Sequence, residues 1–169
     1  TFSYAHVPSV IERQKVLEKI GLPTISEKAD MYQNSYEMIT EAGYNAIGMD
    51  HFSKPNDEFS LAQSSRKLHR NFQGYCTLDT TGQVYGFGAS SISQLYSSYS
   101  QNEKNAAKYI KEIENNNLPV IRGYLMNKNE KIIRNIINEV MCNFYVDLDN
   151  IAKLHDVTSE HVIKLISFK

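Results

Sequence analysis

The chain has 169 residues, with 18 Lys and Arg against 19 Asp and Glu, so its formal net charge is −1. This balance excludes a nucleic-acid binder that works through bulk positive charge, and it excludes an acidic tail protein. Apolar residues make up 41% of the chain and charged residues 22%, which is typical of a globular protein rather than a disordered one.

The first half of the chain predicts strands and helices in alternation. Residues 1–8 alternate apolar and polar and indicate a strand; because it has no lead-in, we expect a segment cut from something longer. Helical spacing follows over residues 9–20. A second helix is expected from an N-cap at Ser26 to Gly43, and a short buried strand over residues 46–52. Helix followed by buried strand is the rhythm of a parallel α/β sheet.

The middle of the chain is more polar. A short helix is predicted over residues 56–66, then a polar and aromatic stretch over 70–77. Residues 84–93 are rich in Gly and Ser around a strand-like core, and residues 101–115 indicate a polar helix.

Beyond Ile121 we expect helices only. One long helix carries a wide apolar face made of Ile132, Ile133, Ile136, Ile137, Val140, Met141 and Phe144. Two shorter helices are expected over residues 149–155 and 160–168, with Thr158 or Ser159 as the N-cap of the second. Their spacing is that of a helix-turn-helix, but the second helix has one Lys and no Arg, so a packing role is favoured over DNA binding.

Three local features could carry chemistry. Asp50 and His51 follow the predicted buried strand and could act in acid–base catalysis, although adjacent strand residues point to opposite faces. Gly86 and Gly88 are a weak match to a phosphate-binding loop; a strand that lets a backbone or ligand come close is the simpler interpretation. The two cysteines form no local motif, so we expect reduced thiols in a cytoplasmic protein, with one long-range disulfide as the alternative.

Several segments taken together resemble a known family. They are Tyr4-Ala5-His6-Val7-Pro8, Gly48-Met49-Asp50-His51-Phe52, Leu68-His69-Arg70-Asn71-Phe72-Gln73-Gly74-Tyr75 and Gly86-Phe87-Gly88-Ala89-Ser90-Ser91-Ile92-Ser93. With the late helix that contains Cys142, they resemble the C-terminal part of oxygen-independent coproporphyrinogen III oxidases, which are radical S-adenosylmethionine (SAM) enzymes. The run over residues 70–75 is the most specific piece, and it favours the oxidases over the haem chaperones of the same superfamily.

The resemblance implies an α/β fold: the C-terminal part of a partial (β/α) barrel of radical SAM type over residues 1–122, then a small helical domain over residues 123–169. It also implies the family's activity, in which two propionates of coproporphyrinogen III are oxidatively decarboxylated to vinyl groups in haem synthesis. The cofactors would be SAM and a 4Fe-4S cluster held by a C-x-x-x-C-x-x-C motif. This chain lacks that motif, so alone it is expected to be inactive.

The resemblance also assigns binding residues. Ala5 and Ile92 match family positions that contact SAM, and Phe72 and Gln73 match positions near a second SAM molecule. No metal ligand and no catalytic residue carries over. We expect coproporphyrinogen III as the substrate, no nucleic-acid or membrane partner, and a monomeric parent enzyme.

A barrel cut through its middle exposes a sheet edge, so the chain should self-associate through a strand near its N-terminus. The alternative function is a non-catalytic haem-chaperone-like relative or another binding module.

Overall fold

A computed structural model of the protein describes residues 3–72, 74–78 and 82–167. The chain divides into two compact units, Thr1–Ser60 and Leu61–Lys169, and each is considered by itself. The expected domain boundary between residues 122 and 123 remains a prediction.

In the first unit, a short 3-10 turn (Glu12–Gln14) leads into helix α1 (Lys15–Ile20), and α2 (Ile25–Glu41) follows. The N-cap of α2 is Thr24 rather than the expected Ser26. The Thr24 hydroxyl accepts a bond from the Glu27 backbone N–H at 3.2 Å, and the Glu27 carboxylate accepts from the Thr24 N–H at 2.7 Å. This reciprocal pair satisfies two otherwise free donors at the helix start, which Ser26 could not do from inside the first turn.

The stretch predicted as one buried strand is instead a hairpin. Strands β1 (Asn45–Gly48) and β2 (His51–Ser53) pair antiparallel. The chain reverses at Met49, whose φ of 51° is left-handed. The apolar run hid this turn because Met is not a residue that sequence patterns associate with reversal. Ser3–Val7 also form no strand, so the sheet edge expected near the N-terminus does not lie there, and self-association remains a prediction.

Tyr32 and Tyr36 form an aromatic stripe on α2 that packs on this hairpin. The Tyr32 hydroxyl donates to the Met49 carbonyl at 2.8 Å, and the rings of Tyr36 and Phe52 meet edge-on with centroids 5.7 Å apart. Ile47 of β1 is fully buried. Edge-on aromatic pairs add to the burial energy of the two rings, so the stripe fixes the helix to the hairpin.

Helix α3 (Glu58–Ser64) joins the two units along the chain, and the second unit then opens with the antiparallel hairpin of β3 (Leu68–Asn71) and β4 (Gly74–Thr77). A three-stranded antiparallel sheet follows, in the order β5 (Ile92–Gln94), β6 (Ser98–Asn102) and β7 (Val120–Leu125). The strand pairs among the described residues are all antiparallel, so the parallel pairing expected from the helix–strand rhythm is not formed within this part of the chain.

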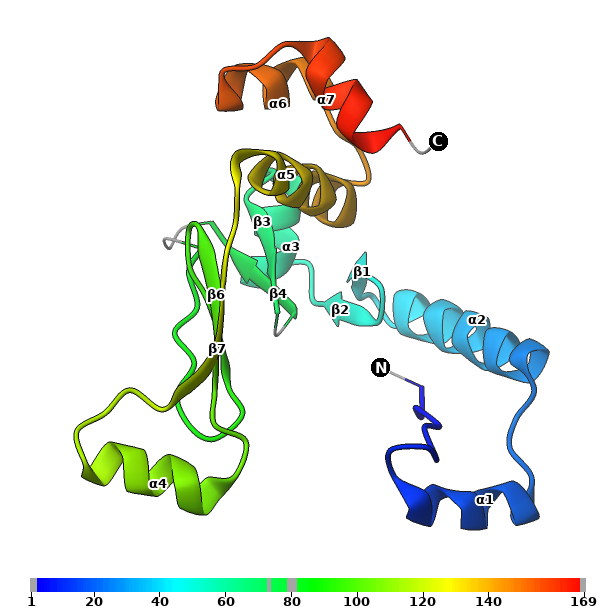
Figure 1. Ribbon diagram of the computed structural model, residues 1–169. Coiled ribbons are helices and arrows are strands. Elements are labelled where there is room, and N and C mark those ends of the chain that lie inside the picture. The colour runs from blue at the N-terminus through cyan, green and yellow to red at the C-terminus, as the bar shows by residue number, and fades with distance from the viewer. Residues whose placement is uncertain (1–2, 73, 79–81, 168–169) are drawn as a thin grey trace. The chain divides into compact units, whose positions relative to one another are not determined.

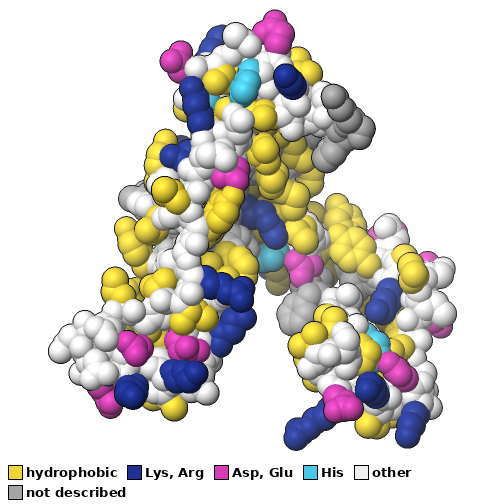
Figure 2. Space-filling view, in the orientation of Figure 1, with side chains coloured by type: hydrophobic (Ala, Val, Ile, Leu, Met, Phe, Trp, Pro, Cys, Tyr) yellow, Lys and Arg dark blue, Asp and Glu magenta, His cyan; other side chains and the backbone are white. Residues whose placement is uncertain are grey.

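Helix α4 (Ala106–Glu114) connects β6 to β7 and is shorter than predicted, because β6 occupies the start of the expected range. Strand β7 extends to Leu125, which corrects the expectation of helices only beyond Ile121. All six residues of β7 are exposed. Hydrophobic side chains are visible on the surface of the second unit (Figure 2).

The helical end forms as predicted from its apolar face. Helix α5 (Lys128–Asn143) lies between the β3–β4 hairpin and the pair α6 (Leu148–His155) and α7 (Ser159–Ile166), as Figure 1 shows. Thr158 is the N-cap of α7. The buried core of this part consists of Ile132, Ile136, Ile151, Ala152 and Val162.

Candidate functional site

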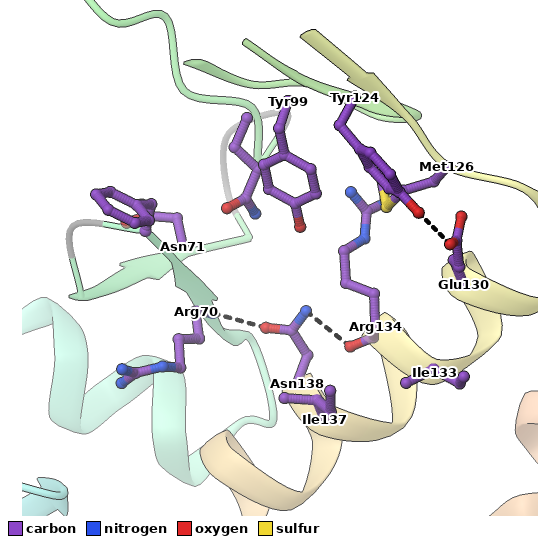
Figure 3. Close-up of a pocket in the computed structure, with 12 residues that line it drawn as sticks. Arg70, Asn71, Tyr99, Tyr124, Met126, Glu130, Ile133, Arg134, Ile137 and Asn138 are labelled. Atoms are coloured by element: carbon purple, nitrogen blue, oxygen red, sulfur yellow. Dashed lines mark hydrogen bonds between the residues drawn. The ribbon is translucent and has the colours of Figure 1, made fainter. Parts of the chain in front are cut away.

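An open hollow of about 550 Å³ lies in the second unit, between α5 and the sheet β5–β6–β7 (Figure 3). Strand β3 contributes Arg70 and Asn71 to its lining, and Phe72 follows them. The hollow therefore joins three segments that are far apart in the sequence.

Strand register places three side chains with hydrogen-bonding groups on one face of the sheet. Tyr99 of β6 is the direct partner of both Gln94 in β5 and Tyr124 in β7. Directly opposed residues of antiparallel strands point to the same face, so these three side chains form a row across the sheet. All three line the hollow.

The opposite wall is one face of α5. Arg134 and Asn138 are four residues apart and so lie on the same side of the helix. Arg134 donates to the carbonyls of Leu95 at 3.1 Å and Tyr96 at 2.6 Å, which ties α5 to the β5–β6 turn. Asn138 accepts from the Arg70 backbone N–H at 3.1 Å and thereby ties α5 to β3.

The rim of the hollow carries one carboxylate, and its hydrogen bonds are satisfied. The Tyr124 hydroxyl donates to Oε1 of Glu130, and the Asn127 N–H donates to Oε2 at 2.8 Å in the capping box of α5. The bond from Tyr124 lowers the pKa of Glu130 and raises the pKa of Tyr124. The carboxylate therefore stays ionised, and both of its oxygens are engaged by Tyr124 and Asn127.

The surroundings of the histidine in β3, His69, disfavour its charged form. Burial lowers the pKa of His69, and the nearby Arg134 guanidinium lowers it further. Both effects disfavour the charged imidazolium. The positive charges among the residues that line the hollow are therefore those of Arg134 and Arg70.

A second hollow, also about 550 Å³, lies on the sheet and shares Tyr99 and Tyr124 with the first; Ile92 lines it. Ile92 is positioned by Gly86, where a Cβ atom would lie 2.8 Å from the backbone carbon of Ile92. Only glycine permits this approach. The interpretation of the Gly86–Gly88 segment as one that lets a backbone come close is therefore confirmed.

The loop before β5 is held by one buried amide. Asn102 donates from its side chain to the carbonyls of Gly86 and Gly88, each at 3.1 Å, and to the Ser91 hydroxyl at 3.0 Å. Gly88 itself has a φ of 100°, a backbone conformation that favours glycine.

Of the four residues predicted to bind SAM, the structure brings two onto one surface. Phe72 lines the first hollow and is 63% exposed, and Ile92 lines the second hollow, which shares two tyrosines with the first. Gln73 lies outside the described residues. Ala5 belongs to the first unit, where its carbonyl accepts from the Gln14 side chain at 3.0 Å; it does not end a strand.

Asp50 and His51, the candidate acid–base pair, contact one another: an Asp50 carboxylate oxygen lies 3.0 Å from Nδ1 of His51. Asp50 lies in the β1–β2 turn and His51 begins β2, so the two side chains are not held on opposite faces of one strand. Among the described residues, no group of three or more His, Cys, Asp or Glu side chains could hold a metal ion. Cys76 and Cys142 are both free thiols.

Sequence reasoning missed Gln94, Arg134 and Tyr124. Their role depends on strand register and on which helix face meets the sheet, and neither is visible in a local pattern. The capping box at Asn127 and Glu130 was readable in the sequence as N-x-x-E and would have placed the start of α5.

A search against protein-family models finds no match. The fold, however, matches a solved radical SAM enzyme. The structure of coproporphyrinogen III oxidase from Escherichia coli superimposes with a TM-score of 0.82 at 35% sequence identity, over 91% of this chain and 35% of that one. The fold class inferred from the sequence is therefore confirmed.

The sequence relatives carry the same name. Anaerobic coproporphyrinogen III oxidase 1 of Cereibacter sphaeroides is 43% identical over 147 residues, which are 87% of this chain and 32% of that protein. The oxygen-independent enzyme of Escherichia coli strain K12 is 36% identical over 156 residues, 92% of this chain and 34% of that protein. The resemblance seen in the sequence is thus confirmed, and this chain spans about a third of the length of these relatives.

No helix in the described part of the chain is long and apolar enough to cross a membrane.

Proposed function

We propose that this chain forms one part of an oxygen-independent coproporphyrinogen III oxidase and supplies a wall of its cofactor and substrate site. Relatives at 36% and 43% identity bear that activity in their names. The observation that carries the proposal is the continuous surface through Tyr99 and Tyr124, which has Phe72 at one hollow and Ile92 at the other.

The residues of this surface fit a bound SAM molecule. Phe72 offers an exposed aromatic face for a flat ring, and Ile92 offers an apolar contact beside a backbone that Gly86 brings close. When bound, SAM would supply the radical that removes a hydrogen atom from a propionate of the substrate. Ala5 and Gln73 are proposed as further contacts on the strength of the resemblance alone.

The 4Fe-4S cluster does not fit this chain. Three cysteine ligands are required by the family motif, and the sequence contains two cysteines. We therefore propose that Phe72, Ile92, Ala5 and Gln73 bind and position SAM, and we assign this chain no part in holding the cluster. Inactivity of the isolated chain and a cytoplasmic location are part of the same proposal.

The proposal is tested in a chimera in which this chain replaces the matching third of the Escherichia coli enzyme. Phe72→Ala should lower turnover about tenfold, because a lost stacking contact of about 1.4 kcal/mol corresponds to that factor. Gln73→Ala should likewise impair turnover. Iron content per protein should stay unchanged in both variants.

Tyr85→Phe serves as a control, because Tyr85 is exposed and lines neither hollow. Equal loss of iron and turnover in the Phe72 and Gln73 variants would show that these residues maintain the fold and do not bind the cofactor. The two assignments would then be wrong.

A further inference from the structure

We infer that the hollow between α5 and the sheet is a carboxylate subsite, with Tyr99, Gln94 and Arg134 as its donors, which holds a propionate arm of the tetrapyrrole. The inference rests on the proposed function and deepens it, since it names which end of the substrate this surface would take.

Two of the donors are unused within the part of the chain that the structure describes. Neither the Tyr99 hydroxyl nor the Gln94 side-chain amide makes a hydrogen bond there, although the Gln94 backbone is paired with Val84. Gln94 is only 5% exposed as a residue, but its amide atoms are not among the fully buried polar atoms of the described chain that lack a partner, so the amide opens into the hollow. An amide N–H that faces a hollow without a protein partner is free to donate to a ligand carboxylate.

Arg134 supplies the charge. A guanidinium has five N–H donors, and the bonds to the carbonyls of Leu95 and Tyr96 account for two of them. No described carboxylate lies within ion-pair distance of Arg134. Figure 3 shows its side chain reaching up from α5 toward the sheet, where Tyr99 points down into the same space. A guanidinium held in place with N–H groups to spare is suited to a planar carboxylate.

The remaining walls suit the body of such a ligand. Met126, Ile133 and Ile137 line the hollow with Phe72 and Tyr124, and they present apolar surface around the polar donors. The one carboxylate at the rim, Glu130, is engaged by Tyr124 and by Asn127. A ligand with a flat apolar ring and a carboxylate arm matches this distribution better than a small hydrophilic acid would.

The test is binding of coproporphyrin III, the stable oxidised form of the substrate, to the chimera in which this chain replaces the matching third of the Escherichia coli enzyme, measured by porphyrin fluorescence. Its tetramethyl ester, which keeps the ring and removes the negative charges, is the matched probe. Tyr99→Phe and Gln94→Met each delete a donor that has no partner in the described chain, so neither breaks an internal bond. Tyr85→Phe is the control for loss of a phenol elsewhere.

We expect each of the two variants to raise the Kd for the tetra-acid about tenfold, as for loss of a hydrogen bond to a charged group, and to leave the Kd for the ester unchanged. Arg134→Lys should raise the Kd for the tetra-acid by at least as much, since a lysine cannot present the planar pair of N–H donors that a guanidinium offers to a carboxylate. Tyr85→Phe should bind both probes like the unaltered chimera.

Two results would overturn the inference, and they differ in what else they affect. If Tyr99→Phe and Gln94→Met bind the acid as tightly as the unaltered chimera, the carboxylate lies elsewhere and the proposed function is untouched. If the unaltered chimera binds neither probe, the subsite is refuted and the proposed function loses its substrate surface as well.

Discussion

The amide of Asn102 is the point at which a single-atom change should have the largest effect on the site. Its NH₂ group binds two carbonyls and one hydroxyl of the Gly86–Ser91 loop at 3.0 to 3.1 Å, and the residue is 7% exposed. Asn102→Asp keeps the shape of the side chain but replaces the donor with an acceptor. The loop that positions Ile92 would then lose the group that closes it.

The expected cost follows from the bonds lost. Two hydrogen bonds to carbonyls contribute about 1 kcal/mol each, and leaving their buried acceptors unsatisfied costs about 1–3 kcal/mol more. We therefore expect Asn102→Asp to lower the free energy of unfolding by at least about 3 kcal/mol. Asn150→Asp is the matched control: Asn150 is exposed in the first turn of α6, where a negative charge is tolerated or mildly favourable.

Urea unfolding followed by circular dichroism measures the free energy of unfolding of both variants. Chymotrypsin cleavage after Phe87, which is highly exposed, reports local opening of the Gly86–Ser91 loop. Asn102→Asp should accelerate that cleavage, and Asn150→Asp should leave its rate unchanged. Equal free energies of unfolding and equal cleavage rates in the two variants would refute the role given to Asn102.

Three further predictions concern the same unit. Gly86→Ala should destabilise the chain, because the new Cβ would lie 2.8 Å from the Ile92 backbone, and a melting temperature equal to that of the unaltered protein would contradict this. Burial lowers the pKa of His69, so the folded state resists protonation, and the free energy of unfolding should fall as pH drops below about 6.5. His69→Gln should make this fall with pH less steep, and an unchanged pH dependence would exclude His69 as its source. Burial, with the nearby Glu139 carboxylate, raises the pKa of Cys142 to about 11, so at about pH 8 iodoacetamide should leave it unmodified until urea is added; rapid labelling of the folded chain would contradict this.

Elements with strong local signals could be predicted from the sequence. The apolar face of α5 and the Thr158 cap of α7 were readable because helix periodicity and capping depend on residues within one or two turns. The pairing of the strands could not be predicted in the same way. The run over residues 46–52 looks like one strand, and only the left-handed Met49 makes it a hairpin.

The candidate site shows the same division. Phe72 and Ile92 came from a resemblance carried by short motifs, and the structure places them at two adjoining hollows. Gln94 and Arg134 could not be found in this way, because their meeting depends on which face of α5 packs against the sheet. Contacts between distant elements are fixed by tertiary packing, and the local pattern does not encode them.

The central claim, that this chain is a working part of a coproporphyrinogen III oxidase, is tested most directly by turnover of the chimera with the Escherichia coli enzyme. The chimera is reduced anaerobically with SAM and coproporphyrinogen III, and the product is oxidised and quantified as protoporphyrin IX. We expect product to form above that of a chimera carrying Phe72→Ala. A folded chimera that holds its iron, binds SAM and forms no product would contradict the account.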